Sequence, residues 1–252
     1  MSGHNKWSKI KHTKGKADAA RSASWTKLIR EITVAVRQGG PDVDSNFRLR
    51  KAVDDAKAVS MPKDTMERAI KRGAGALGEG ETLEELIYEG YGPGGVAVLV
   101  EVTTDNRHRT AGEIRSVFTR TGGTLAQSGA VAWQFARKAF FSFETDSGAT
   151  EDKVMEVALE HGAEDVAEAD GSIDVKAEPA AYEPLKMAFE KAGLKPATAD
   201  ITMIPQATVK ISGQEASTML KLMERLEEND DVQKVHANFD IDQAEMEALS
   251  RA

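Results

Sequence analysis

The chain divides into two stretches of opposite net charge, and the division falls in a segment of small residues, Gly-Ala-Gly-Ala-Leu-Gly-Glu-Gly at residues 73–80. Residues 1–75 hold 17 Lys or Arg against 8 Asp or Glu, whereas residues 76–252 hold 16 against 33, so the net charges are +9 and −17. This separation predicts a basic part that binds a polyanion and an acidic part that phosphate repels. We expect a domain boundary at residues 73–80.

The basic residues are densest at the N-terminus, where the first 30 residues hold eight Lys or Arg and one acid, Asp18. Residues 2–17 are polar and aperiodic, which is typical of an arm without a fold of its own. Its cations alternate with rings such as Trp7 and His12, and this pattern favours nucleic acid, because ammonium groups neutralise phosphate and rings stack on unpaired bases. Two alternatives stay open: the lysines are a solvated segment, or Trp7 packs against the helical region.

Three helices are predicted after the arm, over residues 18–38, from residue 46 or 47 to 60–61, and over residues 63–72. Pro62 disfavours helical geometry in its predecessor and suits the start of the third helix. In the first helix, Trp25 belongs to an apolar face that packs, while the opposite face carries Lys27, Arg30 and Arg37 and is expected to meet phosphate. The apolar face consists of Trp25, Leu28, Ile29, Ile32 and Val36.

Beyond the glycine-rich segment, short strands alternate with helices. Residues 139–204 follow the order strand-helix-strand-strand-helix-strand, which is the ferredoxin-like unit. A strand, a helix and a strand flank this block on each side and predict a second such unit with the first inserted in it, although one larger sheet is the alternative. Strands are predicted over 96–102, 130–135, 139–144, 165–168, 172–176, 195–204, 207–211 and 232–238, and helices over 110–121, 151–161, 179–192 and 214–228.

The predicted fold class is therefore a multidomain α+β protein. Residues 1–78 form a basic helical domain that binds nucleic acid. Residues 79–137 and 205–252 form a discontinuous α+β domain, and residues 138–204 form a ferredoxin-like α/β domain inserted in it.

The sequence offers no candidate for catalysis, a cofactor or a metal. Gly-Tyr-Gly-Pro-Gly-Gly at residues 90–95 matches a dinucleotide fingerprint, but a strand follows it where the fingerprint requires a helix, so a tight turn is expected instead. Cysteine is absent, which excludes thiol nucleophiles and thiolate metal sites, and the five histidines are scattered. The acidic residues 227–231 lack the ligand spacing of a calcium loop and are interpreted as a solvated turn.

No apolar stretch approaches the length of a membrane span, and the longest covers residues 96–100. The N-terminus lacks the apolar stretch of a secretory signal and the arginine-rich pattern of an organelle presequence, so we expect a cytoplasmic protein that does not bind membranes.

Residues 104–109 open the helix predicted over 110–121, with Asp105 as its expected N-cap and Arg107 and Arg109 exposed beside it. Arg107 is taken as a second phosphate contact. The full set of expected nucleic-acid-binding residues is His4, Lys6, Trp7, Lys9, Lys11, His12, Lys14, Lys16, Arg21, Lys27, Arg30, Arg37, Arg48, Arg50 and Arg107.

Several motifs together resemble the YebC/PmpR family. They are Met-Ser-Gly-His-Asn-Lys-Trp-Ser-Lys-Ile-Lys-His-Thr-Lys-Gly-Lys at 1–16, Trp-Thr-Lys-Leu-Ile-Arg-Glu-Ile at 25–32, Asn-Phe-Arg-Leu-Arg at 46–50, Met-Pro-Lys-Asp at 61–64, Glu-Arg-Ala-Ile at 67–70, Tyr-Glu-Gly-Tyr-Gly-Pro-Gly-Gly at 88–95 and Thr-Asp-Asn-Arg at 104–107. Trp25 stands where many members carry phenylalanine, a conservative exchange for a packed ring.

The resemblance implies a helical N-terminal domain and two α/β domains, one interrupting the other. It also implies a cytoplasmic regulator that binds DNA. Related proteins, among them a mitochondrial translational activator, resemble ribosome-associated factors that assist the synthesis of difficult proline-rich stretches.

Two classes of function compete. The first is a non-enzymatic transcriptional regulator whose basic region contacts duplex DNA through phosphate, although no recognition helix with base-reading Asn, Gln and Arg is evident. The second is a translation factor that binds ribosomal or transfer RNA and the ribosome. A weaker reading is a scaffold whose acidic α/β domains bind a protein partner.

Replacement of Lys9, Lys11, Lys14 and Lys16 together by alanine tests the arm. If all four contact phosphate, the dependence of log K on log salt for duplex DNA should become shallower by roughly three to four units. A salt titration of binding measures this slope, and an unchanged slope would assign these lysines to a solvated arm.

Overall fold

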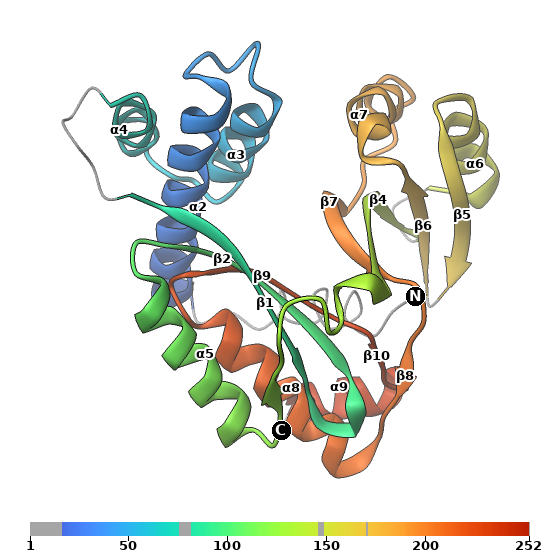
Figure 1. Ribbon diagram of the computed structural model, residues 1–252. Helices are drawn as coiled ribbons and strands as arrows, with labels where there is room; N and C mark the ends of the chain where they lie inside the picture. The colour runs from blue at the N-terminus through green and yellow to red at the C-terminus, as the bar shows by residue number, and fades with distance from the viewer. Residues whose placement is uncertain (1–16, 76–81, 146–148, 170, 252) are drawn as a thin grey trace. The chain divides into compact units, whose positions relative to one another are not determined.

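The computed structural model describes residues 17–75, 82–145, 149–169 and 171–251 (Figure 1). Its contacts divide the described chain into two compact units, one of residues 17–130 with 213–235 and the other of 131–212 with 236–251, apart from the gaps just given. The architecture is a mixture of helices and mainly antiparallel sheets, which agrees with the expected α+β class. The predicted domain boundaries remain predictions.

The three expected helices are present in the first unit as α2 (Ala17–Gly39), α3 (Phe47–Ala58) and α4 (Lys63–Gly73). Asn46 joins the first two, because its side chain accepts from Leu49 N at 3.1 Å as the N-cap of α3 and donates to Ala35 O at 2.8 Å. The predicted start of α3 is thus confirmed. Its end comes at Ala58, slightly earlier than predicted, and Pro62 is the N-cap of α4.

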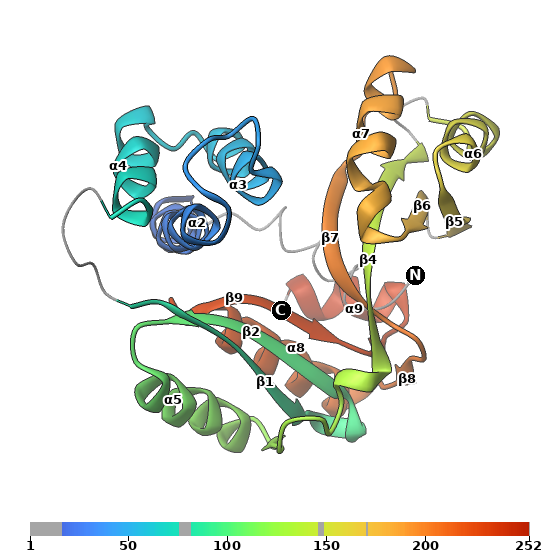
Figure 2. The same ribbon diagram turned by 45° about the horizontal axis from the view of Figure 1, so that its top comes forward.

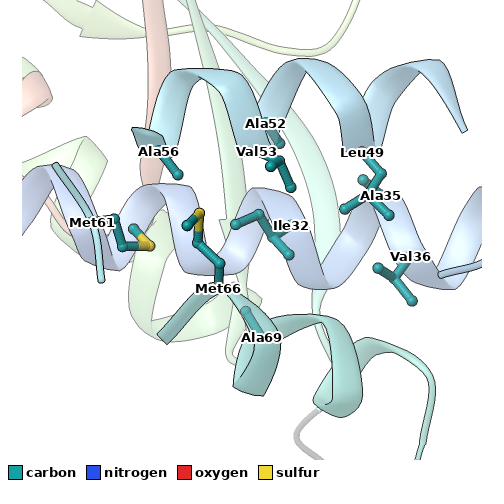
Figure 3. Close-up of a cluster of buried hydrophobic side chains, with 10 residues drawn as sticks. All are labelled: Ile32, Ala35, Val36, Leu49, Ala52, Val53, Ala56, Met61, Met66 and Ala69. Atoms are coloured by element: carbon teal, nitrogen blue, oxygen red, sulfur yellow. The ribbon is translucent and has the colours of Figure 1, made fainter. Parts of the chain in front are cut away.

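A small apolar core holds these three helices together (Figure 3). Trp25 packs against it, and the indole Nε1 donates to Val59 O at 3.4 Å, so its predicted place on the packed face of the helix is confirmed. The buried members are Ile32, Ala35, Val36, Leu49, Ala52, Val53, Ala56, Met61, Met66 and Ala69.

The first unit also contains most of a four-stranded sheet in the order β3-β1-β2-β9, in which β1 pairs antiparallel with both β2 and β3. Helices α5 and α8 cover one face of this sheet (Figure 2). The bounds are β1 Glu84–Tyr91, β2 Ala97–Thr104, α5 Arg107–Arg120, β3 Thr124–Leu125, α8 Gly213–Glu227 and β9 Val232–Ala237.

The glycine-rich hexapeptide at residues 90–95 begins with the last two residues of β1 and continues into the turn to β2, which pairs antiparallel with β1. A 3-10 turn, η1 (Pro93–Gly95), makes this connection, and the positive φ of Gly94 (70°) and Gly95 (77°) explains these two glycines. The expected tight turn is confirmed, and a strand follows it in place of the helix that a dinucleotide site requires.

Three sequence expectations for this region are wrong. The strand β1 was missed, because its acidic residues and Gly90 interrupt an apolar alternation. The strand predicted over residues 130–135 is absent up to residue 134, because η2 (Ala132–Gln134) occupies this segment and β4 (Phe135–Glu144) begins only at Phe135. The N-cap of α5 is Asn106, whose side chain accepts from Arg109 N at 3.1 Å, and not Asp105.

The second unit is built on a sheet in the order β5-β6-β4-β7, all antiparallel, and its chain order is strand-helix-strand-strand-helix-strand, as predicted. Phe141 and Phe143 from the sheet contact the ring of Phe189 edge-on in its core. The bounds are α6 Glu151–Glu160, β5 Ala163–Ala169, β6 Ser172–Ala177, η4 Pro179–Ala181, α7 Tyr182–Lys191 and β7 Thr198–Pro205.

Two short strands and a helix complete this unit. β8 (Val209–Lys210) pairs parallel with β10 (Phe239–Asp240), and α9 (Gln243–Arg251), which the sequence analysis did not anticipate, follows.

A glycine pair tests the packing of α5 on its sheet. A Cβ on Gly90 would lie 2.6 Å from the buried ring of Phe118 and 2.8 Å from Thr124 O, so Gly90→Ala should lower the free energy of unfolding by about 1–3 kcal/mol. Gly112, on the exposed side of α5, has open space around it, and Gly112→Ala should raise the free energy by about 0.5–1 kcal/mol. Urea unfolding measures both, and equal effects would contradict the packing described.

Candidate nucleic-acid interface

The expected interface falls partly outside the described residues. His4, Lys6, Trp7, Lys9, Lys11, His12, Lys14 and Lys16 all lie there, as does the side chain of Arg21, whose backbone is in α2. The remaining candidates are Lys27, Arg30, Arg37, Arg48, Arg50 and Arg107.

Two cations on the face of α2 that was expected to meet phosphate contact the acidic segment 227–231. Lys27 Nζ donates to Glu227 O at 2.5 Å. Arg30 Nη1 donates to Asp231 Oδ1 and Asp230 O, both at 2.6 Å, and to Thr103 O at 3.3 Å. This face of α2 therefore packs on the loop between α8 and β9.

The Asp231 carboxylate is the centre of this contact. Its side chain is 4% exposed and forms ion pairs with Arg30 at 2.6 Å and with Arg109 of α5 at 2.8 Å. Thr110 Oγ1 donates to Asp231 Oδ2 at 2.5 Å, and Thr104 Oγ1 lies 3.1 Å from the same oxygen. The interpretation of residues 227–231 as a solvated turn is wrong for Asp231, because four side chains enclose its charge.

The environment fixes the protonation state of this group. Burial alone would raise the pKa of the Asp231 carboxyl, but the hydrogen bonds from Thr110, Arg109 and Arg30 outweigh it and lower the pKa below its ordinary value. The hydrogen bonds to Asp231 and Asp105 raise the pKa of the Arg109 guanidinium. The carboxylate of Asp231 and the guanidinium of Arg109 thus stay ionised together across the physiological range.

Arg48 of α3 forms a second ionic contact within the same unit. Its Nε and Nη2 donate to the two oxygens of Glu31 at 2.6 and 2.9 Å, and Nη2 also donates to Glu85 of β1 at 2.5 Å. Burial opposes the charge on Arg48, but the hydrogen bonds with Glu31 and Glu85 raise its pKa. The hydrogen bond with Arg48 in turn lowers the pKa of Glu85.

The other predicted residues are scattered. Arg37 is exposed in the last turn of α2. Arg50 is half-buried, and its Nη1 donates to Asp44 O at 3.2 Å. Arg107 is exposed at the first position of α5, where its carbonyl accepts from the Tyr88 hydroxyl at 3.2 Å. The structure therefore brings Lys27 and Arg30 together on the segment 227–231, whereas Arg50 bonds to Asp44 and Arg107 accepts from Tyr88.

Sequence reasoning missed Asp231 and Glu85, the partners of the two arginines. No local sequence pattern indicates either partner. Arg30 and Asp231 are 201 residues apart, and an acidic residue near a strand, such as Glu85, is common in proteins. Among the described residues, no group of His, Asp or Glu is arranged to hold a metal ion. None of the helices in the described part of the chain combines the length and apolar character needed to cross a bilayer.

The chain belongs to the TACO1/YebC family. Residues 5–76 match the family profile described as the TACO1/YebC protein N-terminal domain, and residues 83–239 match the profile of the TACO1/YebC second and third domain. The expected family resemblance is confirmed.

The relatives share nearly the whole chain. A protein of Geobacter sulfurreducens is 57% identical and one of Citrifermentans bemidjiense is 55% identical, in each case over 99% of this chain and all of the relative. Both are named "probable transcriptional regulatory protein". A crystal structure of a conserved hypothetical protein from Aquifex aeolicus superimposes with a TM-score of 0.80 at 47% identity, over 89% of this chain and 92% of the other.

The Asp231 contact predicts a pH-dependent stability. Because the pKa is lowered in the folded protein, the contribution of Asp231 is complete above the unfolded-state pKa of 3.8 and is lost as the pH falls through the folded-state value. Asp231→Asn should lower the free energy of unfolding at pH 7 by about 1–3 kcal/mol and flatten its decline in acid.

Urea unfolding at pH 7 and at a series of acid pH values measures this effect. Asp230→Asn is the matched control, because the side chain of Asp230 is exposed. If the two variants lose the same stability at pH 7, the carboxylate of Asp231 does not hold the contact together.

Proposed function

We propose that this protein is a non-enzymatic DNA-binding regulator of transcription that contacts the phosphate backbone through its N-terminal arm and helical region. The single observation that carries the proposal is the separation of charge, +9 in residues 1–75 against −17 in the remainder. The names of its relatives support a role in transcriptional regulation. A transcriptional regulator is not a class of enzyme, and we expect this protein to act by binding its partners without catalysing a reaction.

The acidic residues 76–252 determine which part of the protein a polyanion can approach. Phosphate repels the α/β part, so a polyanion approaches from the side of the arm and helical region. The ionic contacts of Arg30 and Arg48 to Asp231 and Glu85 hold the helical region on the first sheet. We assign these two arginines a structural role, because contact with phosphate would leave a carboxylate without its partner, and in the case of Asp231 a buried one.

The finer organisation belongs to the same proposal. We propose that residues 79–137 and 205–252 form one α+β domain, with the ferredoxin-like block of residues 138–204 inserted in it. The strand order β5-β6-β4-β7 supports the ferredoxin-like assignment. The acidic surface of these domains suits a protein partner, and we expect the whole protein to act in the cytoplasm.

A translation factor that binds ribosomal or transfer RNA is the second candidate. The observation that favours it is the interleaving of Trp7, His4 and His12 with lysines in the arm, because rings stack on unpaired bases.

Crosslinking of the full-length protein to nucleic acid in growing cells, followed by sequencing of the attached strands, separates the candidates. The proposal predicts DNA fragments enriched at least several-fold over an untagged strain, concentrated upstream of genes whose transcripts change on deletion. Recovery dominated by ribosomal or transfer RNA would replace the first candidate with the second. Recovery of neither would contradict nucleic-acid binding altogether.

A further inference from the structure

Among the side chains that the structure describes in the helical region, most cations already have a hydrogen-bond or ion-pair partner within the chain. Arg30 and Arg48 bind Asp231, Glu31 and Glu85, as described above. Three lysines pair with an acid one turn away on their own helix: Lys51 with Asp55 at 2.8 Å, Lys57 with Asp54 at 3.3 Å and Lys63 with Glu67 at 3.6 Å. The charge available to a ligand is therefore smaller and more localised than the sequence suggests.

The exception is α4. Arg68, Lys71 and Arg72 are all exposed, and their side chains form no hydrogen bond or ion pair with another described residue. At 100° per residue, Lys71 and Arg72 lie on either side of Arg68 within an arc of about 100°. We call these three side chains the α4 basic face.

The core fixes the direction of this face. Met66 and Ala69 point into the helical core (Figure 3), and Ile70 packs against it. The centre of this apolar arc lies nearly opposite Arg68 on the helix. The C-terminal end of α4 is seated closely on α2, because a Cβ on Gly73 would lie 2.7 Å from Thr33 O. The three cations are thus held on the outside of a packed helix.

Negative charges near the α4 basic face reduce its potential without cancelling it. Lys71 and Arg72 stand in the last turn, where the helix dipole places about half a negative charge. Asp64 is exposed one turn before Arg68, and Glu67 is exposed one turn before Lys71. Glu67 pairs with Lys63 at 3.6 Å, and neither acid forms an ion pair with the three cations. The three cations therefore leave a net positive face, because the charge of Glu67 is balanced by Lys63.

We propose that the α4 basic face is a docking surface for the phosphate backbone of duplex DNA, an inference that rests on the function proposed above and adds three residues to its interface. Charge complementarity is the first argument, since three unpaired cations face outward from the basic part of an acidic protein. Arg68 and Arg72 are separated by about 6 Å along the helix axis, and one strand of a duplex offers a phosphate about every 3.4 Å.

The absence of rings selects a duplex over a single strand. No large aromatic side chain is exposed in the described part of residues 24–75, and those exposed elsewhere among the described residues are Tyr91 and Trp133. Single-stranded binding requires rings on which bases stack, whereas a duplex keeps its bases stacked inside and presents phosphate. The α4 basic face offers cations for phosphate and no exposed ring on which a base could stack.

Two full-length variants that each remove three positive charges provide the test. The first combines Arg68→Gln, Lys71→Gln and Arg72→Gln, and the control combines Lys51→Gln, Lys57→Gln and Lys63→Gln, the three lysines with acidic partners. Binding to a short duplex DNA and to a single-stranded RNA of equal length is measured over a series of salt concentrations, with thermal unfolding as a check on folding.

The α4 variant should make the slope of log K against log salt shallower by about two to three units for duplex DNA, and the control by less than about one. Equal slopes in the two variants, with the wild-type protein still bound, would overturn the α4 basic face and leave the proposed function standing. A larger change for RNA than for the duplex would overturn the choice of ligand. Wild-type protein without salt-dependent binding to either probe would refute the proposed function and this inference together.

Discussion

A single buried carboxylate, that of Asp231, joins the helical region to the first sheet. Burial of one charge without partners would cost several kcal/mol, so Asp231 is tolerable only because Arg30 and Arg109 neutralise it and threonine hydroxyls fill its remaining hydrogen-bonding sites. These groups come from three segments that are far apart in the sequence: α2, the end of β2 together with the start of α5, and the loop before β9. The three segments meet at the charge of Asp231.

This constraint changes which cations remain for a ligand. The count of basic residues in the N-terminal region suggests a uniformly positive head, but ion pairs within the chain use Arg30 and Arg48, and acids on the same helix neutralise several lysines. A phosphate that recruited Arg30 would have to leave Asp231 buried beside one remaining arginine. When the cations that have partners are set aside, the α4 basic face is left as the positive surface of the described helical region.

Local patterns predicted local structure well. The 3.6-residue spacing of Trp25, Ile32 and their neighbours, the cap at Asn46 and the stop before Pro62 fixed three helices, because each depends on residues within a few turns. The failures are of two kinds. In β1, acids occupy strand positions and hide the alternation. The strand predicted over residues 130–135 is wrong up to residue 134, where η2 forms a turn before β4.

The candidate interface was less predictable than the fold. Whether an arginine is free or paired depends on contacts such as that of Arg30 with Asp231, and no spacing rule reports a partner 201 residues away. The helical periodicity of α2 correctly separated its apolar face from the face that carries Lys27 and Arg30. Periodicity does not indicate whether this second face contacts a ligand or another part of the same chain.

The most direct test of this account is the coupling energy between Arg30 and Asp231, obtained from the free energies of unfolding of Arg30→Met, Asp231→Asn and the double variant. If the carboxylate depends on its arginine, the double variant should be less destabilised than the sum of the single ones, with a coupling of about 1–3 kcal/mol. Additivity to within about 0.5 kcal/mol would show that the two groups do not stabilise each other and would contradict the central role assigned to Asp231.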